Sequence, residues 1–325
     1  MKFEAGILKL DVAAEAARIE QWLRQVLGRD LRRRGLVIGL SGGVDSSVTA
    51  ALAVRALGAE RVFGLLMPER HSEEATLGLS QQVAEHLGVG YEVEDISGIL
   101  ESVGFYRRYD AAVRQVIPGY GDGWKSKLVG ADVLGRDGFN YFTIVVEDPE
   151  GRQSRSRLPL EAYLEIVAAT NFKQRTRKML EYYHADRLNY AVAGTPNRLE
   201  YDQGFFVKNG DGAADVKPIA HLYKTQVYDL ARFLGLPEAI CNRHPTTDTY
   251  SLAQKQEEFY FPLPYGQMDL CLCGLNHGVA VEEVAAAAGL EVEQVNRVWA
   301  DIRTKRSTTR YLHRAPVTVE AVPLA

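Results

Sequence analysis

The sequence of 325 residues predicts an α/β fold, in which a doubly wound parallel sheet is flanked by helices. Two observations lead to this prediction. Short apolar runs, which are typical of buried strands, alternate with longer segments whose apolar residues recur at helical spacing. Small-residue turns directly follow two of these runs, at residues 41–47 and 194–200. Strands that alternate with helices pair in parallel through right-handed crossovers, so both turns are expected at the carboxyl edge of one sheet.

The alternation is regular up to residue 96. The predicted elements are, in chain order, a helix over 12–27, a strand over 36–40, a helix ending near 57, a strand over 61–67, a helix over 72–87 and a strand over 91–96. The first helix is amphipathic, whereas the run Leu36-Val37-Ile38-Gly39-Leu40 is apolar throughout, as expected for a buried strand.

The alternation stops between residues 107 and 160, which we interpret as an inserted segment. Residues 139–147 resemble a strand, and the turn sequence Asp148-Pro149-Glu150-Gly151 follows, so the insertion is expected to contain half of a β-hairpin. The α/β pattern then returns with a helix over 161–184, a strand over 188–193 and a helix over 223–234. Helices over 267–272, 281–288 and 292–303 form a C-terminal helical region at 257–325, and the whole chain, 1–325, is expected to be a single domain.

The composition is that of an ordinary globular protein, with 46% hydrophobic residues, 25% charged residues and a formal net charge of −4. A balance of this kind speaks against bulk nucleic-acid binding. The absence of an apolar run of about 20 residues and of a secretory leader predicts a cytoplasmic protein without a membrane partner. The three cysteines, Cys241, Cys271 and Cys273, suit neither a disulfide framework nor a zinc site, so we expect reduced thiols.

The turn after the first strand has the sequence Ser41-Gly42-Gly43-Val44-Asp45-Ser46-Ser47. A glycine-rich turn before a helix offers backbone N–H groups and a positive helix end to an anion, which predicts a phosphate site. The lysine of the nucleoside-triphosphatase loop is absent, because no lysine lies between Gly39 and Leu57. A dinucleotide fingerprint is absent as well. The plain alternative is a glycine–serine turn with no ligand.

A second group of motifs lies in the latter half of the chain. It consists of the turn Gly194-Thr195-Pro196-Asn197-Arg198-Leu199-Glu200, a glycine-rich segment over 204–215 that contains Gly210-Asp211-Gly212, and the segment Leu222-Tyr223-Lys224-Thr225-Gln226-Val227. Each motif alone is ambiguous, since such turns and such a lysine are common on protein surfaces.

Together and in this order, the motifs resemble those of the NAD synthetases, a family of the PP-loop ATP pyrophosphatases. The resemblance covers residues 12–100 and 165–312, and its further matches are Leu65-Leu66-Met67-Pro68, the helix with Asn171, Arg175 and Arg177, Pro245-Thr246-Thr247-Asp248, Tyr265-Gly266-Gln267-Met268-Asp269 and Lys305-Arg306-Ser307. The resemblance implies a PP-loop fold, also described as adenine nucleotide alpha hydrolase-like.

The resemblance also implies roles for individual residues. ATP would be bound by Ser41, Gly42, Gly43, Asp45, Ser46, Ser47, Met67, Arg175, Thr195, Lys224, Thr246 and Thr247. The second substrate would be contacted by Asn171, Lys208, Asp211 and Asp215. Asp45 and Glu200 would bind Mg²⁺, for which hard carboxylate oxygens are suited. Asp45, Lys224 and Asp211 would carry the catalysis, with Asp211 receiving a proton from ammonium.

The reaction implied is the ATP- and Mg²⁺-dependent adenylation of deamido-NAD, followed by attack of ammonia to give NAD, AMP and pyrophosphate. A carboxylate that attacks a phosphate meets anion repulsion, which explains the need for a cation and for lysines. The family resemblance further implies a homodimer. Because the chain has no length to spare for an amidotransferase domain, ammonia is expected to be free or supplied by a separate protein.

Three alternatives stay open at this point. The insertion at 107–160 could reshape the pocket of a PP-loop ligase for a different carboxylic acid. A PP-loop sulfur transferase would use Cys271 or Cys273 as its sulfur carrier. A nucleotide-binding regulator would bind ATP at the loop but would catalyse no reaction.

Overall fold

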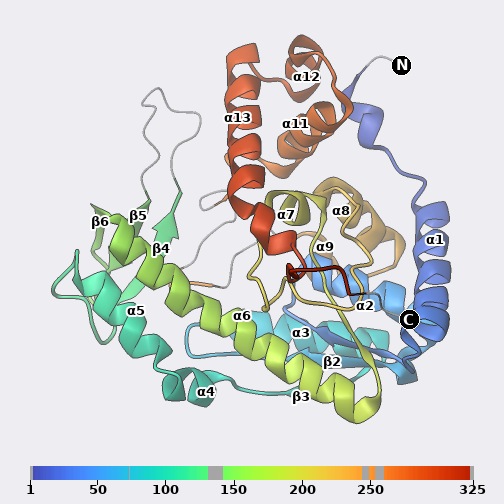
Figure 1. The fold of residues 1–325 in the computed structure, drawn as a ribbon, viewed down its shortest axis with the longest axis horizontal. Helices are drawn as coiled ribbons and strands as arrows, with labels where there is room; N and C mark the ends of the chain where they lie inside the picture. Colours follow the sequence, from blue (N-terminus) through green and yellow to red (C-terminus); the bar gives the residue numbers. More distant parts are fainter. Residues whose placement is uncertain (1–2, 73, 131–141, 244–248, 253–259, 323–325) are drawn as a thin grey trace.

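The computed structural model describes residues 3–72, 74–130, 142–243, 249–252 and 260–322. Its centre is a four-stranded sheet with the order β3-β2-β1-β7, in which every neighbouring pair is parallel (Figure 1). The strands are β1 (Leu36–Gly39), β2 (Val62–Leu66), β3 (Gly90–Val93) and β7 (Ala191–Ala193). This arrangement confirms the predicted α/β class.

Helices connect these strands and extend the chain beyond them. The helices of the main part are α1 (Val12–Gln25), α2 (Val44–Leu57), α3 (Glu74–Leu87), α6 (Leu160–Leu188), α7 (Arg198–Gln203), α8 (Lys224–Phe233) and α9 (Glu238–Cys241). Short helical segments, η1 (Ala5–Leu8), η2 (Val26–Leu31), η3 (Ala59–Arg61) and η4 (Arg310–His313), complete it. No helix in the ranges described is long and apolar enough to cross a membrane.

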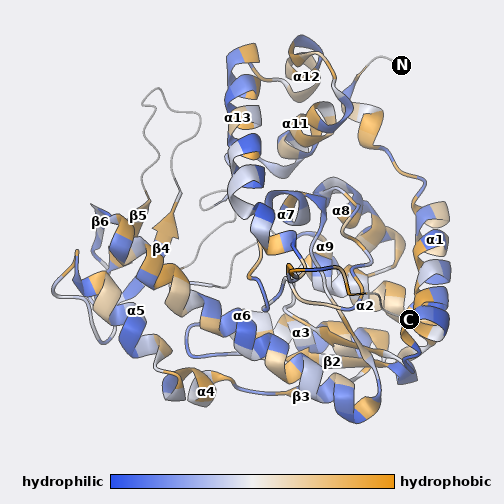
Figure 2. Cartoon of the chain, viewed as in Figure 1, coloured by the Kyte–Doolittle hydropathy of each residue, from blue (hydrophilic) through white to orange (hydrophobic). Residues whose placement is uncertain are grey.

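Side chains of the strands alternate between two separate hydrophobic clusters. On β1, Leu36 and Ile38 belong to one cluster, together with buried residues of α1, α2 and α8. Val37 belongs to the other, with residues of α6 and of α5 (Phe105–Arg114). Strand β7 follows the same rule, because Ala191 and Ala193 face the first cluster and Val192 the second. The sheet is therefore covered by helices on both faces, as a doubly wound sheet requires. Figure 2 shows the resulting mixture of hydrophilic and hydrophobic residues on the outer helices α1 and α6.

The segment that we interpret as an insertion, 107–160, begins inside a helix and continues into a small antiparallel sheet. It contains α5 (Phe105–Arg114), preceded by α4 (Ser97–Ser102), and the strands β4 (Lys125–Val129), β5 (Thr143–Glu147) and β6 (Gln153–Arg157), which pair in that order. The predicted hairpin is confirmed as β5–β6. Its turn is closed by the Asp148 carboxylate, which accepts N–H bonds from Glu150 and Arg152 at 3.1 and 2.8 Å. Predicted strand residues 139–141 lie outside the described ranges.

The C-terminal helices are α11 (Tyr265–His277), α12 (Val281–Ala288) and α13 (Val292–Thr309). They share a third hydrophobic cluster that includes Met268, Val284 and Trp299. In Figure 1 they stand together beside the sheet domain, with α13 reaching down toward α7. The prediction of 281–288 was accurate to the residue, and the other two helices are longer than predicted.

Two strand boundaries were clearly wrong. The strand predicted over 91–96 ends at Val93, where β3 stops. Residues 188–193 were expected to form a strand, but α6 continues to Leu188 and the strand contains only Ala191–Ala193. The helix ends at Asn189, which has the left-handed backbone angle φ of 54° that asparagine tolerates better than most residues. The apolar residue Leu188 therefore closes the helix instead of opening the strand.

The strand order determines where a ligand can bind. From β1 the chain first adds β2 and β3 on one side, and only much later β7 on the other side. After β7 the chain forms an isolated parallel bridge between Ala193 and Val216, so the connections that follow β1 and β7 lead away in opposite directions. A crevice at the carboxyl ends of two such strands is the usual ligand site of an open α/β sheet.

Candidate active site

The loop after β1 has a backbone that only glycine fits. Gly42 has a φ of +64°, and a Cβ atom there would lie 2.9 Å from the Leu79 Cβ and 3.0 Å from the Thr76 carbonyl oxygen. The hydroxyls of Ser46 and Ser47 donate to the Gly43 carbonyl oxygen at 3.1 and 2.8 Å, which ties the loop to the first turn of α2. Gly43, the N-cap residue of α2, leaves the helix N–H groups free of a capping side chain. The loop is thus built as a rigid cradle for an anion.

The loop after β7 faces this cradle and positions a carboxylate. Asn197 is the N-cap of α7, and its side-chain oxygen accepts N–H bonds from Leu199 at 3.0 Å and Glu200 at 3.3 Å. The Glu200 carboxylate in turn accepts the N–H of Asn197 at 3.2 Å. This reciprocal capping box holds Glu200 in the first turn of the helix.

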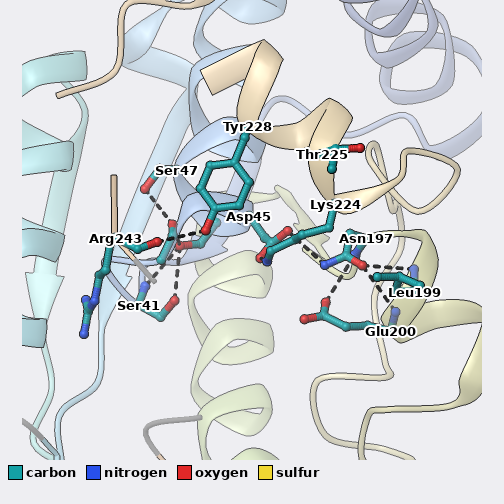
Figure 3. Close-up of polar contacts among 12 residues, drawn as sticks. Ser41, Asp45, Ser47, Asn197, Leu199, Glu200, Lys224, Thr225, Tyr228 and Arg243 are labelled. Atoms are coloured by element: carbon teal, nitrogen blue, oxygen red, sulfur yellow. Dashed lines mark hydrogen bonds and ion pairs between the residues drawn. The ribbon is translucent and has the colours of Figure 1, made fainter. Parts of the chain in front are cut away.

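Lys224 joins the two loops. Its side chain is only 1% exposed and forms an ion pair with the Asp45 carboxylate, whose side chain is 17% exposed. The Asn197 side-chain nitrogen donates to the other Asp45 oxygen at 3.1 Å. Figure 3 shows Lys224 and Asp45 pointing toward each other, with Asn197 between Asp45 and Glu200. Residues from α2, α7 and α8 therefore meet in one polar cluster at the carboxyl ends of β1 and β7.

Helix α11 fixes Lys224 from behind. The Asp269 carboxylate accepts the N–H groups of Lys224 and Thr225 at 3.2 and 2.8 Å, and also the Thr225 hydroxyl at 2.8 Å. Burial raises the pKa of Asp269 to about 6, although these bonds favour its ionised form. The backbone at the start of α8 is thus pinned, so that the lysine side chain reaches the site from a fixed point.

The electrostatics of the cluster favour a bound cation. Burial and the charge of Asp45 raise the pKa of Glu200 to about 7. Burial alone would lower the pKa of Lys224, but its attraction to Asp45 and Glu200 outweighs this effect and raises it. Lys224 interacts with both carboxylates, whose hard oxygen atoms are suited to a divalent ion. This donor chemistry fits Mg²⁺, which takes one or two protein carboxylates together with phosphate oxygens.

A cavity of about 820 Å³ opens in front of the cluster. Its size is within the range of roughly 300–1,000 Å³ that is usual for ligand sites. The predicted site residues that line it are Ser41, Gly43, Asp45, Ser46, Met67, Asn171, Thr195, Glu200, Asp211 and Lys224. The structure therefore brings together residues from both halves of the sequence. Asp211 accepts the Val207 N–H at 2.7 Å, and burial raises the pKa of its carboxyl group.

Other predicted site residues do not line this cavity. Gly42 and Ser47 shape the loop behind it. Arg175 is exposed on α6, where it donates to the Lys208 carbonyl oxygen at 3.3 Å. The Lys208 ammonium donates to the carbonyl oxygens of Tyr311 and Arg314 at 2.9 and 3.1 Å. Asp215 accepts the Val192 N–H at 2.7 Å, at the edge of β7. The predicted roles of these residues stay predictions, and Thr246 and Thr247 lie outside the described ranges.

Several cavity residues were not found from the sequence. Arg243 reaches the phosphate loop, where it donates to the Gly42 carbonyl oxygen at 3.3 Å and to the Thr76 hydroxyl at 3.1 Å. Nothing in its local sequence indicates this position. Lys178 and Glu181 form an ion pair of 2.5 Å on α6, and both line the cavity. Their spacing of three residues on one helix face was the available signal.

The fold and the site together define a class of protein. A glycine-rich loop without a lysine follows strand β1 of a parallel sheet. Its Asp45 pairs with the buried Lys224, and the Glu200 carboxylate lines the same cavity, so a lysine and a second carboxylate come from elsewhere in the chain. These features define a nucleotide-binding α/β protein of the PP-loop class.

Comparison with known proteins identifies the family within this class. The sequence model of the family described as NAD synthase matches residues 15–116 and 138–311. The NH₃-dependent NAD⁺ synthetase of Rhizobium meliloti (strain 1021) is 63% identical over 320 residues, which cover 98% of this chain and 96% of that protein. The chain therefore belongs to the NAD synthase family. Residues 117–137, between the two matched ranges, lie inside the inserted segment.

Solved structures share the fold. The NMN synthetase of Francisella tularensis superposes with a TM-score of 0.63 at 22% identity and covers 95% of this chain and 99% of its own. The NH₃-dependent NAD synthetase of Campylobacter jejuni superposes with a TM-score of 0.62 at 23% identity and covers 96% of this chain and 100% of its own. At these identities the likeness extends to the fold alone.

Proposed function

We propose that the protein is an ammonia-dependent ligase that adenylates the carboxylate of deamido-NAD and converts it to NAD, with ATP as co-substrate. The observation that carries the proposal is that the phosphate loop, with its Asp45, lines the same cavity as Glu200 and Lys224. The high identity to a relative named as an NH₃-dependent NAD⁺ synthetase supports the choice of reaction.

In the first step, negative charge accumulates on the departing pyrophosphate, and the cavity offers positive groups that stabilise it. A carboxylate oxygen of the acceptor attacks the α-phosphorus of ATP, the bond to the β-phosphate breaks, and pyrophosphate leaves with the bonding electrons. The N–H groups at the start of α2 stabilise the leaving group, together with Lys224 and with Arg243 beside the loop. Lys224 thus supplies the positive charge that a nucleoside-triphosphatase loop would take from its own lysine.

Asp45 and Glu200 would hold Mg²⁺ in this step. A bound Mg²⁺ neutralises phosphate charge and orients the phosphate oxygens. The two carboxylates come from different helices, α2 and α7, so that a phosphate on the loop would meet both. Lys224 attracts both carboxylates and so offsets part of their mutual repulsion in the absence of a ligand.

The second step needs neutral ammonia. Its lone pair attacks the acyl carbon, AMP leaves with the former carboxylate oxygen, and one proton must depart from the nitrogen. Asp211 lines the cavity, and its buried carboxyl group has a raised pKa, which suits it to accept that proton. We also propose that the ammonia is either free in solution or supplied by a separate amidotransferase, and that the protein is cytoplasmic.

A second copy of the chain is the partner we propose for α6. This helix exposes Leu160, Leu164, Met179 and Tyr183, whose side chains are 54–71% exposed. Residues spaced by four share one side of a helix, and Arg175 lies on the same side as Met179. A pair of chains joined along α6 would bury this stripe and bring Arg175 close to the interface. The variant Leu164→Glu with Met179→Glu should be monomeric in light scattering, whereas a dimer of unchanged mass would reject this interface.

A sulfur transferase is less well supported. Cys271 and Cys273 are buried in the cluster of the C-terminal helices, and neither lines the cavity. Burial raises the pKa of Cys271 to about 12, so the thiolate needed for sulfur transfer is disfavoured.

The test is a panel of acceptor acids in a pyrophosphate-release assay with ATP, Mg²⁺ and ammonium. The proposal expects release with deamido-NAD, with AMP in equal amount. Release with a different acid alone, such as nicotinate mononucleotide, would favour a ligase for another carboxylate. Tight ATP binding without turnover for any acid would favour a regulator, and formation of ADP and phosphate would reject the PP-loop chemistry.

A further inference from the structure

Asn197 contacts both of the carboxylates assigned to the metal site. Its side-chain nitrogen donates to Asp45 at 3.1 Å, and its backbone nitrogen donates to Glu200 at 3.2 Å. The residue is 0% exposed. It is therefore a fixed point between the first turn of α2 and the first turn of α7.

The hydrogen bonds determine the orientation of the Asn197 amide. The side-chain oxygen accepts the N–H groups of Leu199 and Glu200, so the side-chain nitrogen must face Asp45. A flipped amide would place its oxygen against a carboxylate and its donors against N–H groups, which loses every one of these bonds. The orientation of the amide is thus fixed by the backbone N–H groups at the start of α7.

The two oxygens of Asp45 are held by different kinds of donor. Lys224 contacts one with a positive charge, and Asn197 contacts the other with a neutral amide. A neutral donor orients a carboxylate without cancelling its charge, so the carboxylate keeps its attraction for a cation. With Asn197 in place, the direction of Asp45 does not depend on the ion pair with Lys224 alone.

We propose that Asn197 is a positioning residue that fixes the separation and direction of Asp45 and Glu200, and thereby sets the affinity of the site for a divalent cation with ATP. This inference rests on the proposed function, in which the two carboxylates bind the metal. Replacement of a partner that orients metal ligands usually lowers the metal affinity or the activity by about 10–100-fold.

Two substitutions separate this role from the capping of α7. Asn197→Ser keeps a good N-cap oxygen but removes the amide donor to Asp45. Asn197→Asp also keeps the cap but sets a carboxylate against Asp45. Asp11→Ser is the matched control, because Asp11 caps α1 through the Ala14 N–H at 3.0 Å and α1 contributes no described residue to the cavity.

The experiment measures binding of Mn²⁺ with α,β-methylene-ATP to the full-length protein by water-proton relaxation. We expect Asn197→Ser and Asn197→Asp both to bind the pair more weakly than the wild type, Asn197→Ser by about 10–100-fold. The magnesium concentration for half-maximal turnover should rise more than kcat falls. Asp11→Ser should bind as the wild type does, and all three variants should unfold cooperatively within about 2–4 °C of it.

A folded Asn197→Ser variant with wild-type affinity for the pair would overturn this inference and leave the proposed function intact. Weakening that appears equally in Asp11→Ser would also overturn it, because a loss common to both caps reflects general stability. A wild-type protein that fails to bind Mn²⁺ with the nucleotide analogue would reject the proposed function itself, and the inference with it.

Discussion

The ion pair between Asp45 and Lys224 can be tested by a double-mutant cycle. Asp45→Asn leaves the Lys224 ammonium in a position that is only 1% exposed, without the carboxylate that it contacts. Removal of one partner of a buried pair costs about 3–5 kcal/mol. The lower end applies here, because Glu200 still attracts the lysine. Lys224→Met should destabilise less, since Asp45 is 17% exposed and keeps its bond from Asn197.

In the double variant both charges are gone and neither is left uncompensated. The double variant should therefore be more stable than the sum of the single losses predicts, by a coupling of about 1–3 kcal/mol. The assay is urea unfolding, with a shifted midpoint and an unchanged m value as the sign of a pure change in stability.

Activity should separate from stability in the same set of variants. Pyrophosphate release should fall by at least about 100-fold in all three, including the double variant with its recovered stability. Single losses that simply add, within about 0.5 kcal/mol, would contradict the mutual stabilisation of the pair. Full pyrophosphate release by Asp45→Asn would remove Asp45 from the catalytic role.

Three further outcomes follow from the structure. Burial and the charge of Lys173 lower the pKa of His71 from 6.5 to about 4, so the unfolded chain binds a proton more readily than the folded one. Stability should therefore be lost as the pH falls from 6.5 toward 4, and His71→Gln should flatten this loss in unfolding curves. Gly42→Ala should lower the unfolding midpoint and weaken ATP binding in calorimetry, since its Cβ would lie 2.9 Å from Leu79; unchanged binding would contradict the rigid cradle. Cys271→Ala with Cys273→Ala should keep full pyrophosphate release, and its loss would revive the sulfur-transfer reading.

Local patterns were enough to find the fold and the two loops. Periodicity located β1, β2 and most helices, because buried strands and amphipathic helices differ in their apolar spacing. The strand order was beyond this kind of reasoning, since the pairing of β1 with β7 joins residues about 150 positions apart and depends on packing over both sheet faces. The end of α6 was misplaced for a different reason, because a leucine such as Leu188 suits a helix end and a strand start equally.

The site was only partly predictable. Asp45, Glu200 and Lys224 could be named from their motifs, but their contact could not, because the backbone of Lys224 is held by Asp269 in α11, far along the chain. The sequence places Asn197 in the turn after the strand, but it does not show that Asn197 contacts both Asp45 and Glu200. These contacts depend on how α2 and α7 lie relative to each other. Arg243 gave no local signal, since a single arginine in a loop is usually exposed.

The most direct measurement of the central claim follows an oxygen atom. Deamido-NAD labelled with ¹⁸O in its carboxylate is incubated with ATP, Mg²⁺ and ammonium, and the products are analysed by mass spectrometry. Adenylation predicts one ¹⁸O atom in AMP for each NAD formed, because the carboxylate oxygen leaves with the α-phosphate. Label in inorganic phosphate, or unlabelled AMP beside newly formed NAD, would contradict the account.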